Sequence, residues 1–306
     1  MKVKLFTHTD LDGIGCAIVG KYAFEDIHVE YCEYDNVNEK VNTYITDRNY
    51  LEFDHTFIKD ISVSELNADL LNYIYNNGSN ITLIDHHDTA KWLNKYEWAW
   101  VDDYHKDELN DLPLQKSSGT SMFYELLIAE KFIDPTDELD DFTELVRRYD
   151  AWEWNTKYND HHAKQLNDLL YIIGRERFLK RFDDNLNPAF NEQEIMLLEM
   201  EEENIKKYIT SKSKQLIERD INGYKVGVVF AERYSSQLGN ELAKENPHLD
   251  LIAIINPSYS VSYRTVKDDV HLGEFAKLFG GGGHPKAAGS PISVELKEEL
   301  ISVIFQ

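Results

Sequence analysis

Short apolar segments alternate with amphipathic helical segments over the first 85 residues of the chain. Residues 3–6, 56–61 and 81–84 are typical of buried strands, whereas residues 13–24 and 64–76 have the spacing of helices. Strands that alternate with helices form parallel sheets, and such sheets bind ligands beyond the carboxyl ends of their strands. The pattern predicts an α/β fold with any functional site at that edge.

Each of these three predicted strands ends in or is followed by side chains of the types that bind metal ions. They are His8, Asp10 and Asp12 after the first strand, Asp60 at the end of the second, and Asp85, His86 and His87 after the third. Carboxylates gathered at one edge repel one another unless they are protonated or neutralised by cations. A mixed Asp/His set suits Mn²⁺, Fe²⁺ or Zn²⁺ rather than Ca²⁺. The sequence therefore predicts a transition-metal site.

The first of these segments is expected to be extended, so that His8, Asp10 and Asp12 share one face and point the same way. In the alternative interpretation the segment is a solvated loop, and Asp12 only caps the helix that follows.

The adjacent histidines His86 and His87 are expected to point to opposite sides of an extended segment. We expect His86 to bind metal and His87 to face the substrate, while Asp85 either binds metal or orients a histidine. The same three letters recur at residues 160–162. No apolar strand precedes them and a helical pattern follows, so they predict a helix start with solvated histidines.

Four consecutive glycines, followed by His284, form a second distinctive segment at residues 280–284. Gly281, Gly282 and Gly283 would let the backbone approach an anion closely, with their amides forming a nest. A flexible hinge is the alternative. Arg264 lies on a predicted strand leading toward this loop, and either binds phosphate with its guanidinium or forms a surface salt bridge.

The remaining pattern indicates how the chain is divided. Residues 118–182 are mostly helical, and residues 191–218 form a charged segment without Gly or Pro that predicts one connecting helix. Strands are expected to return only after the Asn222-Gly223 turn. We predict an N-terminal catalytic domain at 1–185, a helical connector at 186–219 and a smaller α/β domain at 220–306.

These motifs, in this order, resemble the DHH/DHHA1 phosphoesterase family. The first motif is matched by His8-x-Asp10-x-Asp12, the second by Asp60 and the family signature by Asp85-His86-His87. The glycine run with His284 and residues 287–289 resembles the DHHA1 signature. The resemblance covers nearly the whole chain and is greatest to small oligoribonuclease (nano-RNase) and cyclic-nucleotide phosphodiesterase-like members.

The resemblance implies two divalent cations, with Mn²⁺ preferred and Mg²⁺, Co²⁺ or Fe²⁺ as alternatives. One ion would be held by His8, Asp10 and Asp60, and the other by Asp12, Asp60, His86 and a fourth-motif aspartate. That aspartate is assigned to Asp150, with Asp102 and Asp103 as rivals. His87 would face the substrate phosphate, and His87 and Asp85 are the expected catalytic side chains outside the ligand set.

The implied activity is hydrolysis of short oligonucleotides or dinucleotides to mononucleotides. The alternatives are a phosphatase for adenosine bisphosphate or pyrophosphate-like molecules and a non-catalytic nucleotide sensor. The glycine-rich segment disfavours a pyrophosphatase, and the complete set of Asp and His ligand types disfavours a sensor. The formal net charge of −23 disfavours a stable complex with long nucleic acid, which is bound mainly through Lys and Arg.

Other features bear on location and assembly. Cys16 and Cys32 have no CxxC partner and are expected to be reduced core thiols. No apolar segment approaches the ~20 residues of a membrane span, and no signal-peptide core is present. We expect a cytoplasmic protein with no membrane partner and a homodimer as one option. The sequence leaves open RNA or DNA, linear or cyclic substrate, and the polarity of cleavage.

Overall fold

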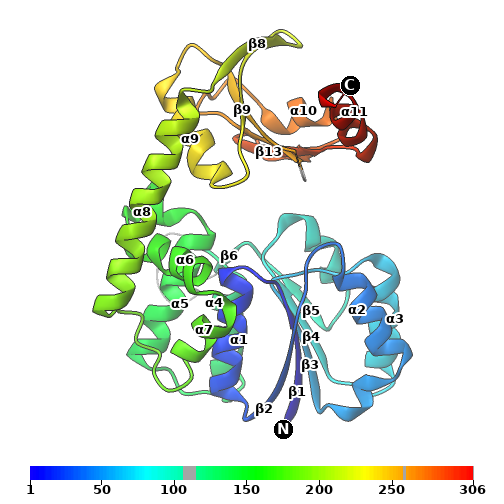
Figure 1. Ribbon diagram of the computed structural model, residues 1–306. Helices are drawn as coiled ribbons and strands as arrows, with labels where there is room; N and C mark the ends of the chain where they lie inside the picture. The colour runs from blue at the N-terminus through cyan, green and yellow to red at the C-terminus, as the bar shows by residue number, and fades with distance from the viewer. Residues whose placement is uncertain (106–114, 258–259, 306) are drawn as a thin grey trace. The chain divides into compact units, whose positions relative to one another are not determined.

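The computed structural model describes residues 1–105, 115–257 and 260–305, which divide into two compact units, residues 1–198 and 199–306. The first, the N-terminal unit, is built on a five-stranded sheet in the order β2-β1-β3-β4-β5, in which all neighbours are parallel (Figure 1). Its strands are β1 (Lys2–Thr7), β2 (Asp26–Tyr31), β3 (His55–Lys59), β4 (Ile81–Asp85) and β5 (Ala99–Val101).

Helices cover both faces of this sheet (Figure 1). Helices α1 (Leu11–Ala23) and α4 (Gly119–Ala129) lie on one face, and α2 (Val37–Thr46) and α3 (Glu65–Asn76) lie on the other. Helices α5 (Asp137–Asp150), α6 (His161–Ile173) and α7 (Arg175–Arg181) pack against α1, α4 and one another. Successive strand residues point to opposite faces, so Leu5 and Phe57 enter the core under α1 and α4, whereas Phe6 and Ile58 enter the core under α2 and α3. The predicted parallel α/β fold is confirmed.

The strand register brings the predicted site residues to one edge. Thr7 pairs with Lys59, and Lys59 pairs with Ile84, so β1, β3 and β4 end side by side. His8, Asp60 and the Asp85-His86-His87 segment therefore follow at the same carboxyl edge, as expected for a parallel sheet.

One local prediction at this edge was wrong. Helix α1 begins at Leu11, and Asp10 is its N-cap, with its side chain accepting a hydrogen bond from the Gly13 amide at 3.0 Å. Asp12 therefore lies in the first helical turn instead of on an extended face shared with Asp10. The side chain of Asp10 satisfies an amide that the helix itself leaves unpaired, which explains the earlier start.

The C-terminal unit contains a mixed six-stranded sheet in the order β12-β13-β11-β10-β9-β8. Helix α8 (Glu192–Ser213) crosses the boundary between the units. The other elements are β8 (Ile217–Ile221), β9 (Tyr224–Phe230), α9 (Ser235–Glu245), β10 (Leu251–Asn256), β11 (Ser260–Arg264), α10 (Leu272–Lys277), β12 (Gly282–Gly283), β13 (Ala287–Pro291) and α11 (Val294–Ile304). The predicted second α/β domain is confirmed.

The predicted connecting helix over residues 191–218 extends too far. It ends at Ser213, and residues 217–221 form strand β8, which pairs antiparallel with β9 across the Asn222-Gly223 turn. Both turn residues have positive φ, 50° and 84°, as two-residue hairpins require. The Asn-Gly pair therefore marks a hairpin, with a strand before it as well as after it.

Among the described residues of either unit, no helix has the length and apolar composition of a membrane span. Shorter elements complete the N-terminal unit. The short elements are the 3-10 helices η1 (Asn49–Glu52) and η2 (Asp88–Lys95), the π-helical turn η3 (Trp154–Tyr158), and the strand pair β6 (Tyr104–His105) and β7 (Gln115–Lys116). Cys16 and Cys32 are free and buried, as predicted.

Candidate metal centre

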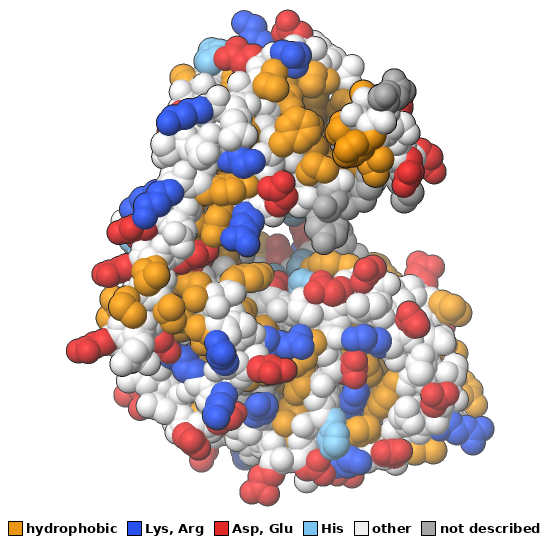
Figure 2. All heavy atoms as spheres, viewed as in Figure 1, with side chains coloured by type: hydrophobic (Ala, Val, Ile, Leu, Met, Phe, Trp, Pro, Cys, Tyr) orange, Lys and Arg blue, Asp and Glu red, His pale blue; other side chains and the backbone are white. Residues whose placement is uncertain are grey.

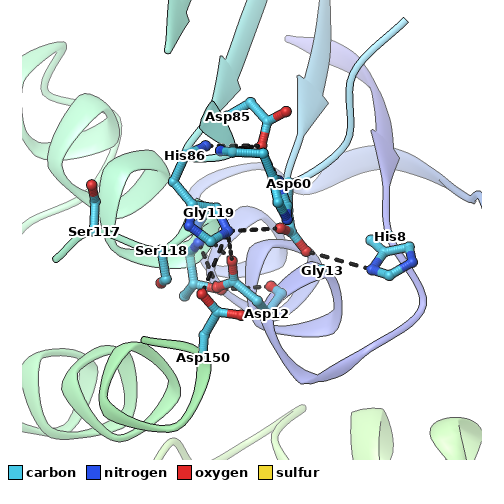
Figure 3. A network of polar contacts seen from close by, with 12 residues as sticks. His8, Asp12, Gly13, Asp60, Asp85, His86, Ser117, Ser118, Gly119 and Asp150 are labelled. Carbon is cyan, nitrogen blue, oxygen red and sulfur yellow. Dashed lines mark hydrogen bonds and ion pairs between the residues drawn. The ribbon is translucent and has the colours of Figure 1, made fainter. Parts of the chain in front are cut away.

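Side chains from four segments converge at the carboxyl edge of the parallel sheet (Figure 3). Three overlapping groups of ligand types form there: His8 with Asp10 and Asp60, Asp12 with His86 and Asp150, and Asp60 with Asp85, His86 and His87. Within each group, the ligand atoms lie within 4.8 Å of one another. Helix α1 supplies Asp12, and the last residue of α5 supplies Asp150. The structure thus brings together all six residues predicted as metal ligands.

The first group is centred on the imidazole of His8. Its Nδ1 lies 2.9 Å from Asp10 Oδ2 and 4.0 Å from Asp60 Oδ2. The Nδ1–Asp10 contact does not have the alignment of a hydrogen bond. On the other side of the ring, Nε2 lies 3.5 Å from Glu33 Oε2. This arrangement leaves Nδ1 facing two carboxylates and gives Nε2 a carboxylate that fixes the ring orientation.

The second group is centred on His86. Its Nε2 lies 3.4 Å from Asp60 Oδ1, 3.7 Å from Asp12 Oδ2 and 3.4 Å from Asp150 Oδ2. The two oxygens of Asp60 therefore face different groups, Oδ2 toward His8 and Oδ1 toward His86 (Figure 3). This geometry is what a carboxylate that bridges two cations requires.

Buried atoms without partners show that these residues fit cations. Among the described residues, His8 Nδ1, Asp60 Oδ2 and His86 Nε2 are buried and make no hydrogen bond. Burial, with repulsion from Asp12 and Asp10, raises the pKa of Asp60 and of Asp150 well above the usual carboxyl range. Because buried polar atoms are otherwise almost always satisfied, the cluster has the negative charge and open lone pairs that divalent cations neutralise.

The pKa values of His86 and His8, the two histidines of the ligand groups, are shifted in opposite directions. Burial lowers the pKa of His86, which favours the neutral imidazole that can ligate a cation. For His8, burial lowers the pKa, but the contact with Asp10 outweighs it and raises the pKa. A raised pKa means that the His8 imidazole holds its second proton more tightly, and a cation bound at Nδ1 would take the place of the proton there.

Asp60 has the backbone conformation of a constrained site residue. Its φ is 54°, in the left-handed region, although it ends a strand and is not glycine. Asp and Asn tolerate this region better than other non-glycine residues, at a modest energetic cost. The conformation directs the Asp60 carboxylate between the two groups instead of along the strand.

Asp85 is fully buried and holds His87. Its Oδ1 accepts hydrogen bonds from the backbone amides of His86 and His87, at 2.8 and 3.3 Å, and contacts His87 Nδ1 at 2.6 Å. Of the two roles left open for Asp85, this geometry favours orienting a histidine. Burial lowers the pKa of His87, but Asp85 and other carboxylates raise it to about 9. In the metal-free protein, His87 is therefore an imidazolium near neutral pH.

The N-terminus of α4 clamps Asp12, a feature that the sequence analysis missed. The amide of Gly119 donates to Asp12 Oδ2 at 2.5 Å (Figure 3). The amide of Thr120 donates to Asp12 Oδ1 at 2.9 Å. The hydroxyl of Thr120 donates to the Asp12 backbone carbonyl at 2.6 Å. Amides at a helix N-terminus stabilise a carboxylate, so α4 keeps the side chain of Asp12 oriented.

Gly119 has no room for a side chain. A Cβ there would lie 2.5 Å from Asp60 Cβ and 3.0 Å from Asp12 Oδ2. We expect Gly119→Ala to lower Mn²⁺ affinity and kcat/KM about 10- to 100-fold, the usual effect of disturbing the residues that support metal ligands. Calorimetric titration with Mn²⁺, after circular dichroism has shown that the variant is folded, measures the change.

Thr120→Ser is the matched control for Gly119→Ala. It retains the hydroxyl donor to the Asp12 carbonyl and the amide donor to the carboxylate, so we expect metal affinity within about twofold of the parent. Unchanged Mn²⁺ affinity in a folded Gly119→Ala protein would show that the close packing around Gly119 does not hold the ligands.

The position of Asp150 distinguishes it from its rivals. Asp103 pairs with Lys91 at 2.7 Å, and Asp102 accepts a hydrogen bond from the Tyr104 amide; neither joins the ligand groups found among the described residues. The helix end that carries Asp150 is fixed by buried Arg147, which bonds Glu144, Glu153 and the Lys116 carbonyl. The geometry therefore favours Asp150 as the fourth-motif residue.

The second Asp-His-His sequence starts a helix, as predicted, but only His161 is exposed to solvent, because His162 is half-buried and its Nε2 lies 3.2 Å from the Pro188 carbonyl. Asp160 is the N-cap of α6 and accepts a hydrogen bond from the His162 amide at 3.0 Å. None of residues 160–162 joins a ligand group within the described part of the chain.

In the C-terminal unit, Arg264 has no ion-pairing partner among the described residues, which removes the salt-bridge alternative there. Its guanidinium donates to the Tyr263 carbonyl at 2.8 Å and to Ser236 Oγ at 2.9 Å. Burial lowers its pKa. Arg264 thus lacks the carboxylate that would compete with a phosphate.

The glycine loop departs from the predicted amide nest. The amide of Gly281 donates to Ala276 and that of His284 to Ala287, while Gly282 and Gly283 form β12 and pair with β13. A Cβ at Gly281 would lie 2.0 Å from the Gly289 carbonyl oxygen. The glycines therefore permit close packing of the loop on β13, and the exposed side chain of His284 lies at its end. Lys286, two residues further along the chain, pairs with Asp268.

Comparison with known proteins agrees with the motifs. Residues 2–147 match the DHH family N-terminal domain, and residues 230–306 match the DHHA1 domain. The sequence is 40% identical to oligoribonuclease NrnB of Bacillus subtilis (strain 168), across 99% of this chain and 76% of that protein. The chain belongs to the DHH family.

Solved structures share the fold of this DHH-family chain. Exonuclease RecJ bound to manganese has a TM-score of 0.60 and 13% identity, covering 98% of this chain and 88% of that chain. The pGpG-specific phosphodiesterase PggH from Vibrio cholerae has a TM-score of 0.54 and 12% identity, covering 99% and 97%. Identities this low show a common architecture, and the site assignments above come from the geometry of this chain.

Proposed function

We propose that this protein is a phosphodiesterase that hydrolyses short oligonucleotides to mononucleotides, with two divalent cations, Mn²⁺ foremost, in its N-terminal unit. The observation that carries the proposal is the position of Asp60, whose Oδ2 faces the group of His8 and Asp10 and whose Oδ1 faces His86 in the group of Asp12 and Asp150. The relationship to an oligoribonuclease over 99% of the chain supports the choice of substrate.

Each side chain has a distinct task in this proposal. His8, Asp10 and Asp60 hold one cation, and Asp12, Asp60, His86 and Asp150 hold the other. Cations bound there supply the activation of water and the neutralisation of phosphate charge that such hydrolysis needs. Asp85 fixes His87 through the 2.6 Å contact, so that the imidazolium donates to a phosphate oxygen or to the leaving oxygen.

The C-terminal unit is proposed to bind a part of the substrate that does not react. Arg264, with no carboxylate partner among the described residues, is available to a phosphate, and His284 and the loop of Gly281, Gly282 and Gly283 lie on the same unit. We retain the division into a catalytic domain, a helical connector and a substrate-binding domain, predicted at 1–185, 186–219 and 220–306, but place the start of the last domain at β8 (Ile217–Ile221), which belongs to its sheet.

Charge supports a preference for short substrates. The net charge is −23, and Figure 2 shows Asp and Glu side chains spread over the visible faces of both units. Each added phosphate of a long substrate would meet an unfavourable field with few cations to compensate. We propose that no stable complex with long nucleic acid forms.

The test compares chain lengths in the presence of Mn²⁺. We expect no turnover in chelator, strong activation by Mn²⁺, and faster hydrolysis of di- to pentanucleotides than of 20-residue strands at matched salt. Product analysis on RNA and DNA series measures this. Faster hydrolysis of the long strands would contradict the substrate class, and turnover of pyrophosphate without any oligonucleotide cleavage would contradict the activity.

A further inference from the structure

An exposed tyrosine lies beside the candidate metal centre and has no role in the account above. Tyr34 follows β2 and is 60% exposed. Its ring centroid lies 4.8 Å from that of His8, with the rings tilted by 47°. It also lies 6.4 Å from the His87 ring, edge to face. Tyr34 therefore borders both a ligand histidine and the histidine proposed to face the phosphate.

The backbone fixes this position. The Asn36 amide donates to the Glu33 carbonyl at 3.1 Å, which closes a turn with Tyr34 and Asp35 at its centre. The Asn36 side chain accepts from the Glu33 amide at 2.9 Å, and the Glu33 carboxylate bonds the Thr9 hydroxyl. The turn is thus attached to the segment that carries His8.

The Tyr34 hydroxyl does not hold the ring in place. Within the described residues it makes no hydrogen bond. Single exposed aromatic residues are common on protein surfaces and need no explanation by themselves. This one is presented by a tight turn against two site histidines, with most of its surface open to solvent.

A short oligonucleotide supplies a group that fits such a surface. The two nucleosides joined by the scissile phosphate lie next to the ligand groups, and each carries a flat aromatic base. Stacking on an aromatic side chain requires no positive charge, so it remains available to a protein whose net charge is −23. Every base has a π-face, so the contact would tolerate all sequences.

We propose that Tyr34 is a nucleobase platform that stacks one of the two nucleosides flanking the scissile phosphate. This inference rests on the proposed phosphodiesterase function. It assigns to Tyr34 the binding and alignment of substrate, and no part in holding cations. Loss of the ring should therefore affect substrates that carry a base and spare the metal centre.

The experiment measures kcat/KM on diadenylate and on two analogues, each with one abasic ribose, for Tyr34→Ala, Tyr34→Phe and Tyr34→Trp. We expect Tyr34→Ala to lower kcat/KM on diadenylate about 10- to 100-fold, the range typical of losing one base–aromatic stack. Tyr34→Phe and Tyr34→Trp should stay within about threefold of the parent, because both keep an aromatic ring. On the analogue that lacks the base stacked by Tyr34, Tyr34→Ala and the parent should have similar kcat/KM, because the stacking contact is already absent.

Two controls separate stacking from structural damage. Tyr73→Ala removes a tyrosine of α3 that is 66% exposed, and should leave kcat/KM unchanged. Calorimetric Mn²⁺ affinity should be the same in Tyr34→Ala and the parent. A loss of Mn²⁺ affinity would overturn the proposal in favour of support for His8, and a Tyr34→Phe defect equal to that of Tyr34→Ala would overturn it in favour of the hydroxyl.

The proposed function can fail separately from this inference. A parent enzyme that cleaves diadenylate, with Tyr34→Ala equally active, overturns the platform alone. A parent enzyme that neither binds nor cleaves diadenylate with Mn²⁺ present overturns the proposed function, and the platform with it.

Discussion

Asp60→Asn is expected to lower kcat/KM on a dinucleotide by at least about 1,000-fold, because one side chain faces both ligand groups and metal ions contribute several kcal/mol to such reactions. Asparagine is chosen over alanine because Asn also tolerates the left-handed conformation of Asp60, φ 54°. Steady-state kinetics in saturating Mn²⁺ measures the loss.

The same substitution should have the opposite effect on the metal-free protein. Burial, followed by repulsion from Asp12, Asp10 and Asp150, raises the pKa of Asp60. A raised carboxyl pKa means that the folded state binds the proton more tightly, so stability falls as pH rises above the ordinary carboxyl range. Asparagine carries no charge to bury. At pH 7.5 we therefore expect metal-free Asp60→Asn to unfold at the parent temperature or above it, and to lose the stabilisation that Mn²⁺ gives the parent.

Asp103→Asn is the matched control for Asp60→Asn. Asp103 pairs with Lys91 outside the ligand groups, so activity and the Mn²⁺-induced shift should match the parent. A metal-free Asp60→Asn protein much less stable than the parent would show that Asp60 serves mainly to hold the fold.

His87→Gln is expected to reduce kcat about 100- to 10,000-fold, the range for loss of a positioned proton donor, while Mn²⁺ affinity stays near that of the parent. Glutamine keeps a hydrogen-bond donor but carries no positive charge. The control is His161→Gln in the repeated Asp-His-His sequence, where the side chain is exposed at the start of α6 and activity should not change. Equal losses in Mn²⁺ affinity and kcat for His87→Gln would instead make His87 a metal ligand.

The Asp85–His87 pair also gives a pH signature in the metal-free protein. The pKa of His87 is about 9, against an ordinary value of 6.5. The pair therefore contributes stability that is complete below about pH 6.5 and is lost as pH rises through about 9. Asp85→Asn should lower the His87 pKa, and NMR titration of the imidazole measures both values. An unchanged titration would contradict the orienting role of Asp85.

Much of the candidate site could be predicted because parallel strands end at a common edge. His8, Asp60 and His86 each follow an apolar strand, so the sheet alone brings them together. The position of Asp12 could not be predicted, because the segment was expected to be extended, whereas Asp10 caps α1 and places Asp12 in its first turn. The family resemblance implied a fourth aspartate, and Asp150 was assigned to it because it ends a predicted helical segment that aromatic residues follow.

The residues that position the proposed metal ligands could not be recognised from the sequence in this way. Gly119 and Thr120 act on Asp12 through backbone amides about 107 residues away in sequence, and neither is a ligand type. Ser118 is the N-cap of α4 in the structure, and a helix start in the sequence does not indicate which carboxylate the helix will face. Glu33 and Tyr34 reach His8 through a turn whose hydrogen bonds appear only in three dimensions.

The central claim is that two cations share Asp60. Crystals of the full chain grown with Mn²⁺, with diffraction recorded on both sides of the manganese absorption edge, test it most directly. The account predicts two anomalous peaks, one bounded by His8, Asp10 and Asp60 and the other by Asp12, Asp60, His86 and Asp150. A single peak, or peaks that do not contact Asp60, would contradict it.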